Sequence, residues 1–108
     1  ADCNSLTSIN IPNSIYAIRS YAFYGCRSLK NIIIPESVNS IEKYAFVNCT
    51  SLTHIAIPDS VESIESGAFY GCDNLKEAVF KGKTLDEVEH MKNYPFGIKD
   101  ESVIKAEL

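Results

Sequence analysis

Four cysteines are the residues of this chain best suited to chemistry, because a thiolate can act as a nucleophile, bind a metal or form a disulfide. They are Cys3, Cys26, Cys49 and Cys72, and each follows the previous one by 23 residues. Structural zinc sites instead use ligands that are paired a few residues apart. Equal spacing places the cysteines in one line of a repeated fold, where we expect them to be buried as free thiols.

A disulfide between neighbouring cysteines, such as Cys3–Cys26, is the alternative to this ladder of thiols. Adjacent strands of a parallel sheet lie about 4.8 Å apart, which falls within the range of about 4.4–6.8 Å between the Cα atoms of a disulfide. The side chains of such a column should run parallel, however, and this favours the free thiols.

The remaining polar residues show no catalytic pattern. The two histidines, His54 and His90, are both expected at outward, solvated positions, so neither is placed to activate a cysteine. The carboxylates follow no spacing that would bury one and pair it with another. These carboxylates include Glu62, Glu65, Asp86, Glu87 and Glu89. We therefore expect no enzymatic activity, no cofactor and no metal.

The cysteine spacing is also the period of the surrounding hydrophobic pattern. The repeated apolar positions are Leu6, Leu29, Leu52 and Leu75; Ile9, Ile32, Ile55 and Ala78; and Ile11, Ile34, Ile57 and Phe80. Further along, the repeated residues are Pro12, Pro35 and Pro58, followed by the pairs Ala22-Phe23, Ala45-Phe46 and Ala68-Phe69. A period of about 20–29 residues with the pattern L-x-x-I-x-I is typical of leucine-rich repeats, in which each coil adds one short strand to a parallel sheet.

Local residue choices agree with this coil. Proline cannot donate to a sheet ladder, so each repeated Pro should end a strand. Gly25, Asn48 and Gly71 share one repeat position, and Gly or Asn tolerates the left-handed backbone that a corner requires. The sequence predicts an α/β repeat solenoid: a right-handed leucine-rich-repeat coil with a short parallel sheet on its concave face.

The motif C-x-x-L-x-x-I-x-I-P-x-S-[IV]-x-x-I-x-x-x-A-F-x-[GN] resembles the BspA-type, or Treponema pallidum-type, leucine-rich repeat over about residues 3–80. Proteins of that family are usually surface or secreted proteins of bacteria and some protists. The resemblance implies adhesion to host proteins or to other cells, and a cell-surface or secreted location. It transfers no binding residue, because the shared positions are core and turn positions.

The repeat ends after Phe80, which divides the chain into repeats over residues 1–83, three full and one partial, and a cap over residues 84–108. Thr84 and Glu87 fit a capping box, which predicts a helix over about 85–92. Its inner face should carry Leu85, Val88 and Met91. Residues 93–97 should turn the chain, and residues 102–106 should form a final strand. No comparable cap precedes Cys3, so we expect a longer array, or self-association through the uncapped N-terminal coil.

Two surfaces are candidates for binding. On the concave sheet, we expect contacts from residues at outward positions: Asn10, Lys30, Asn31, Ile33, Thr53, His54, Ala56, Lys76 and Val79. The alternative is an aromatic column made of Tyr21, Tyr44, Tyr24 and Tyr70, whose rings could stack on sugars or anchor a protein.

Composition narrows the partners. The formal net charge of −4 comes without a basic block, which argues against nucleic acid. No apolar run approaches the roughly 18 residues of a membrane span, which argues against membrane insertion. We therefore expect a non-catalytic module that binds a protein or a glycan, for adhesion or host interaction. The alternative is a structural spacer within a larger protein, with no ligand of its own.

Overall fold

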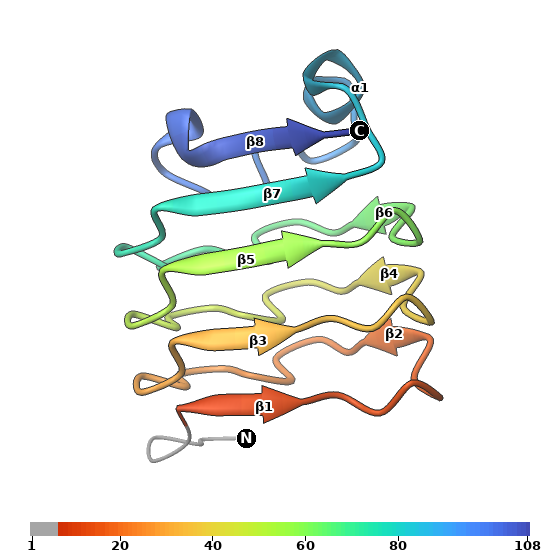
Figure 1. Cartoon of the computed structure of the whole chain (residues 1–108). Coiled ribbons are helices and arrows are strands. Elements are labelled where there is room, and N and C mark those ends of the chain that lie inside the picture. The colour runs from red at the N-terminus through yellow and green to blue at the C-terminus, as the bar shows by residue number, and fades with distance from the viewer. Residues whose placement is uncertain (1–6) are drawn as a thin grey trace.

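The 23-residue period becomes the register of strand pairing in the computed structural model, which describes residues 7–108. Strand β1 (Ser8–Asn10) pairs with β3 (Asn31–Ile33), β3 with β5 (His54–Ile57), and β5 with β7 (Glu77–Lys81), all in parallel. Paired residues are one period apart, as Ile33 and Ala56 show. The chain is thus a leucine-rich-repeat solenoid, and the predicted parallel sheet is confirmed (Figure 1).

A second, narrower sheet lines the opposite side of the solenoid, where the sequence pattern indicated inward residues and no strand. It consists of three parallel two-residue strands, β2 (Ala17–Ile18), β4 (Ser40–Ile41) and β6 (Ser63–Ile64). The repeats within residues 7–83 contain no helix, so the coils consist of short strands joined by turns (Figure 1).

The core between the two sheets is a set of stacked columns, as the repeat predicts. The phenylalanine column is the clearest: the rings of Phe23 and Phe46 lie 5.2 Å apart, and those of Phe46 and Phe69 lie 5.3 Å apart, nearly parallel in both pairs. Phe46 is completely buried. At the first coil the same repeat positions are less covered, since Ile15 is 36% exposed whereas Val38 and Val61 are fully buried.

The corner positions adopt the left-handed backbone that the sequence predicted. The φ angles of Gly25, Asn48 and Gly71 are 67°, 61° and 81°. The next residue in each coil is a cysteine, and the Cys49 thiol donates a hydrogen bond to the carbonyl oxygen of Phe23 in the preceding coil. The corners therefore join neighbouring coils as well as turning the chain.

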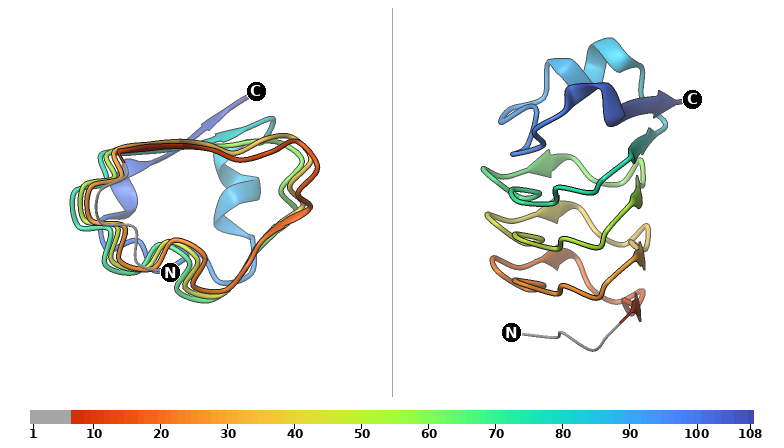
Figure 2. Two further views of the ribbon diagram at one scale, coloured as in Figure 1. Left: turned by 90° about the horizontal axis from the view of Figure 1, so that it is seen from below. Right: turned by 90° about the vertical axis from the view of Figure 1, so that its left-hand side faces the viewer.

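The segment predicted to be the C-terminal cap, residues 84–108, begins with helix α1 (Leu85–Glu89), which is shorter than predicted. The Thr84–Glu87 capping box is confirmed. Val88 is buried against the core, and the helix lies across the end of the stack (Figure 2). The prediction that Leu85 also faces the core is wrong, because Leu85 is 46% exposed. A helix of little more than one turn has few positions that face one side.

Strand β8 (Ile104–Glu107) completes the five-stranded sheet, in the order β1-β3-β5-β7-β8, and follows a 3-10 turn over Glu101–Val103. It starts two residues later than predicted and pairs in parallel with β7, with Ala78 opposite Ile104. The offset is therefore 26 residues and no longer 23. Before β8, the backbone N–H of Phe69 donates to the carbonyl oxygen of Phe96 at 3.0 Å. One coil earlier, the backbone N–H of Phe46 donates in the same way to the carbonyl oxygen of Ala68. The cap thus replaces one coil with a different chain path.

The cysteine column corrects one prediction. Cys26 is disulfide-bonded, so the expectation of four free thiols is wrong at this position. The physical reason is the register, which sets neighbouring cysteines one rung apart, within the range that a disulfide spans. Cys49 and Cys72 are free, and Cys49 is fully buried. Cys3 and Leu6 lie outside the described residues.

Candidate binding surface

The outer face of the five-stranded sheet is built by the alternation of side chains along each strand. Ile32 and Ile55 point into the core, so Asn31 and Ile33 on β3, and His54 and Ala56 on β5, point outward. The in-register pairing then aligns outward residues of successive coils in rows. One row contains Ser8, Asn31, His54 and Glu77, and the next contains Asn10, Ile33, Ala56 and Val79.

The second row carries an apolar strip across the middle of the sheet. Ile33 is 70% exposed, far more than an isoleucine in a coil core, and it lies beside Ala56, which is beside Val79. We call Ile33, Ala56 and Val79 the apolar strip. Burying an exposed apolar side chain against a partner removes its surface from water, which is favourable. The strip is therefore the part of this face best able to anchor a ligand.

Polar groups surround the strip. His54 lies in the neighbouring row, where its Nδ1 is 3.0 Å from the Thr53 hydroxyl. At the far end of the strip, Lys81 of β7 and Glu107 of β8 form an ion pair. Together they border an open depression of about 500 Å³. An apolar centre with a polar rim is the usual anatomy of a protein-binding surface.

The depression gathers some of the predicted residues and leaves others out. Those that line it are Asn31, Ile33, His54, Ala56 and Val79. Lys30, Thr53 and Lys76 directly precede β3, β5 and β7 and do not line the depression, and Asn10 lines another hollow.

Three polar residues that line the depression are absent from the predicted set: Glu77, Lys81 and Glu107. Glu77 had a signal, since it shares the repeat position of His54. Lys81 had a signal, since it occupies the repeat position of Pro12, Pro35 and Pro58 and, unlike proline, can continue the strand. Glu107 had none, because the pairing of β8 does not follow the repeat.

Three of the four predicted tyrosines form one cluster at a corner of the coils. The Tyr21 and Tyr44 rings are stacked with centroids 5.6 Å apart, and the Tyr24 ring meets Tyr21 edge-on at 6.0 Å. Tyr70 is not among these ring contacts and instead borders a separate depression of about 510 Å³ with Pro95. Tyr21 and Tyr24 remain 51% and 48% exposed, so the cluster still presents aromatic surface to a ligand.

The tyrosine column ends at Gly67 for a steric reason. Tyr21, Tyr44 and Gly67 share one repeat position, with φ angles of 60°, 56° and 67°. A Cβ atom on Gly67 would lie only 2.4 Å from Cε1 of Tyr44, so the Tyr44 ring occupies the space that a third side chain would need. Gly67 also contacts the cap: a Cβ atom added to Gly97 would lie 3.1 Å from the Cα of Gly67. The backbone of the cap therefore packs directly against the backbone at Gly67.

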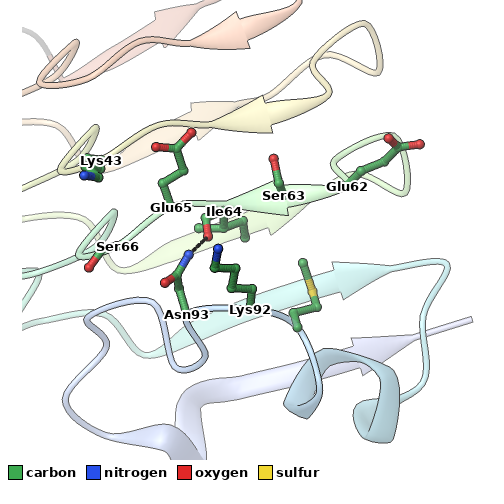
Figure 3. Close-up of a pocket in the computed structure, with 9 residues that line it drawn as sticks. Lys43, Glu62, Ser63, Ile64, Glu65, Ser66, Lys92 and Asn93 are labelled. Carbon is green, nitrogen blue, oxygen red and sulfur yellow. Dashed lines mark hydrogen bonds between the residues drawn. The ribbon is translucent and has the colours of Figure 1, made fainter.

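A smaller pocket of about 360 Å³ lies on the other side of the molecule, between β6 and the cap (Figure 3). Asn93 enters it from the cap and donates from Nδ2 to the carbonyl oxygen of Ile64 at 3.0 Å. This bond satisfies a backbone acceptor at the edge of the three-stranded sheet. Lys43, Glu65 and Lys92 also line the pocket, so charges of both signs surround it. We assign it to the docking of the cap.

The first coil carries an apolar depression of about 240 Å³, to which Ile11, Ile15 and Phe23 contribute. The predicted self-association through this coil stays a prediction. Within residues 7–108, no three or more His, Cys, Asp or Glu side chains gather as a metal site. In the same range, no helical segment combines the length and hydrophobicity that a membrane span requires.

Comparison with known proteins agrees with the geometry. The profile of the BspA type leucine rich repeat region matches residues 1–99 in six copies. This chain belongs to that family. The family resemblance inferred from the sequence motif is thus confirmed. None of the curated proteins matches the chain.

Two solved structures are similar. A leucine rich cell surface protein from Faecalibacterium prausnitzii has a TM-score of 0.69 and 33% identity, over 72% of this chain and 20% of that one. The T. pallidum leucine rich repeat protein has a TM-score of 0.56 and 23% identity, over 97% of this chain and 57% of that one. The second likeness concerns the fold alone. The chain spans about a fifth of the first protein and little more than half of the second.

Proposed function

We propose that this chain is a non-catalytic binding module of a cell-surface or secreted protein, and that the outer face of its five-stranded sheet binds a protein or glycan ligand. The observation that carries the proposal is the apolar strip. Ile33 is 70% exposed in this strip. A polar side chain would be better solvated at this position if no ligand covered it.

The strip is also carried by regularly paired strands, which favours binding. Its three residues come from three parallel strands in one register, and each strand is anchored by buried neighbours such as Ile32, Ile55 and Phe80. A backbone held in this way needs little further ordering when a ligand arrives. Repeat solenoids commonly use such extended faces to bind partners.

The proposed location follows from the family and from a relative. The F. prausnitzii protein, 33% identical to this chain over the matched part, is described as a leucine rich cell surface protein. A function in adhesion or host interaction at a cell surface fits a face that binds an extended partner. The aromatic cluster of Tyr21, Tyr24 and Tyr44 is the second surface able to do so.

The proposal is tested by binding a tetramerised form of the protein to an array of host matrix proteins and glycans. Tetramers are used because avidity reveals weak interactions. The test variant carries Ile33→Glu and Ala56→Glu, which place two charges on the apolar strip. Its matched control carries Tyr21→Glu and Tyr24→Glu, which charge the aromatic cluster equally. Unchanged melting temperatures establish that both variants remain folded.

We expect a specific hit that is lost in the strip variant and kept in the tyrosine variant. The opposite pattern would move the site to the aromatic cluster and contradict the proposal. An array without any hit would favour the spacer function instead.

A further inference from the structure

The two free cysteines, Cys49 and Cys72, occupy equivalent places in neighbouring coils. The Cys49 thiol donates to the Phe23 carbonyl oxygen, and the Cys72 thiol donates to the Phe46 carbonyl oxygen, at 3.1 Å in both cases. Phe23 and Phe46 are themselves one period apart in the phenylalanine column. The two thiols are therefore held on one line, a single rung apart.

The two sulfur atoms lie close enough to influence each other's ionisation: Cys72 lowers the pKa of Cys49, and Cys49 raises the pKa of Cys72. Strands one rung apart set Cα atoms at a separation that a disulfide spans. Cys26, in the same column, is disulfide-bonded, so this column accommodates such a bond.

Accessibility differs between the two thiols. Cys49 is fully buried, whereas Cys72 is partly exposed at the corner after Gly71. A small oxidant therefore reaches Cys72 first. The neighbouring Cys49 sulfur and burial both raise the pKa of Cys72, so little of its reactive thiolate exists at neutral pH.

We propose that Cys49 and Cys72 are a modification site, at which a small disulfide oxidant such as oxidised glutathione forms an intramolecular disulfide. The bond would join the third coil to the last one, on which the cap rests. An oxidising environment such as a cell exterior preserves disulfides of this kind.

The reaction proceeds in two exchanges. The Cys72 thiolate attacks one sulfur of oxidised glutathione, which releases one glutathione thiolate and leaves a mixed disulfide on Cys72. The Cys49 thiolate then attacks the Cys72 sulfur and releases the second glutathione. Each cysteine gives up its proton to solvent, and the two released glutathione thiolates take up protons from solvent. The cysteine pair is oxidised, and one molecule of oxidised glutathione is reduced to two thiols.

The test incubates the folded chain with oxidised glutathione at about pH 8.5, where thiolate is more abundant. After acid quenching and blocking of free thiols, cleavage after Glu62 and Glu65 separates the two cysteines onto different peptides. Mass spectrometry then identifies the linkage. The matched variant Cys49→Ser keeps the accessible thiol but removes its partner.

In the wild-type chain we expect a loss of two hydrogens, a cross-link between the Cys49 and Cys72 peptides, and a melting temperature higher by roughly 5–15 °C. The Cys49→Ser variant should instead stop at a mixed disulfide on Cys72. The wild-type result stands by itself if that variant fails to fold. A wild-type chain that also stops at the mixed disulfide, stays unmodified, or links Cys26 to Cys49 would overturn the proposal. A cross-link that forms no more readily in the folded chain than in urea would do the same.

Discussion

Replacing Phe46 with alanine tests the stacked core at the place where the coils depend on it most. Phe46 is fully buried, and its ring lies between those of Phe23 and Phe69, at 5.2 and 5.3 Å. Truncation of a buried phenylalanine costs about 3–5 kcal/mol. Here two ring contacts are lost, each worth about 0.5–1.5 kcal/mol beyond the buried area.

We therefore expect the Phe46→Ala variant to lie in the upper part of that range, at about 4–5 kcal/mol. Domains of this size are commonly stable by only about 5–15 kcal/mol, so the loss should be large in a urea titration. The titration can be followed by far-UV circular dichroism and by tyrosine fluorescence, since the chain has six tyrosines and no tryptophan.

Phe23→Ala is the matched control. Phe23 is only partly buried and stacks on one ring within the described residues, that of Phe46. Its truncation should cost roughly half as much, about 2 kcal/mol. A Phe46→Ala variant that loses no more stability than Phe23→Ala, or less than about 1 kcal/mol, would refute the assignment of the core columns.

Three further predictions concern the cap. Gly97→Ala should destabilise the protein by about 2–3 kcal/mol, because φ is 85° and the new Cβ would lie 2.9 Å from the Tyr70 backbone nitrogen. Gly25→Ala, with a similar φ but open space, should cost about 1 kcal/mol, and equal losses by thermal melting would contradict the close packing. Removing residues 84–108 should expose the last coil and cause aggregation, which light scattering would detect; a soluble monomer would show that this segment is no cap. Hydrogen bonds from Ser102 lower the pKa of Asp100, so the stability that this carboxylate contributes is present above its ordinary pKa and is lost as pH falls through the lowered value. Asp100→Asn should therefore flatten the stability profile below about pH 4, and an unchanged slope would count against this contribution.

Most of the repeat could be predicted because one period determines the strands, the core and the corners together. Once Cys26, Cys49 and Cys72 define the register, the outward position of Ile33 and the left-handed backbone of Asn48 follow from the alternation of strands and from steric rules. The same logic predicted the outward face that carries the apolar strip.

The cap could be predicted only in part, because its contacts break the period. The capping box is local, so Thr84 and Glu87 revealed it. The offset of β8, which brings Glu107 beside Lys81, depends on how residues 93–103 pass over the last coil. The end of the tyrosine column at Gly67 likewise depends on a tertiary contact with Tyr44.

The measurement that tests the proposed binding face most directly is the affinity of the wild type and of Ile33→Glu for a ligand found on the array, by surface plasmon resonance. A charge buried at the centre of the contact should weaken binding by at least about tenfold, whereas Tyr24→Glu, on the aromatic cluster, should leave it within about twofold. Equal affinities of the wild type and Ile33→Glu, with both proteins folded, would contradict the assignment of the apolar strip as the binding site.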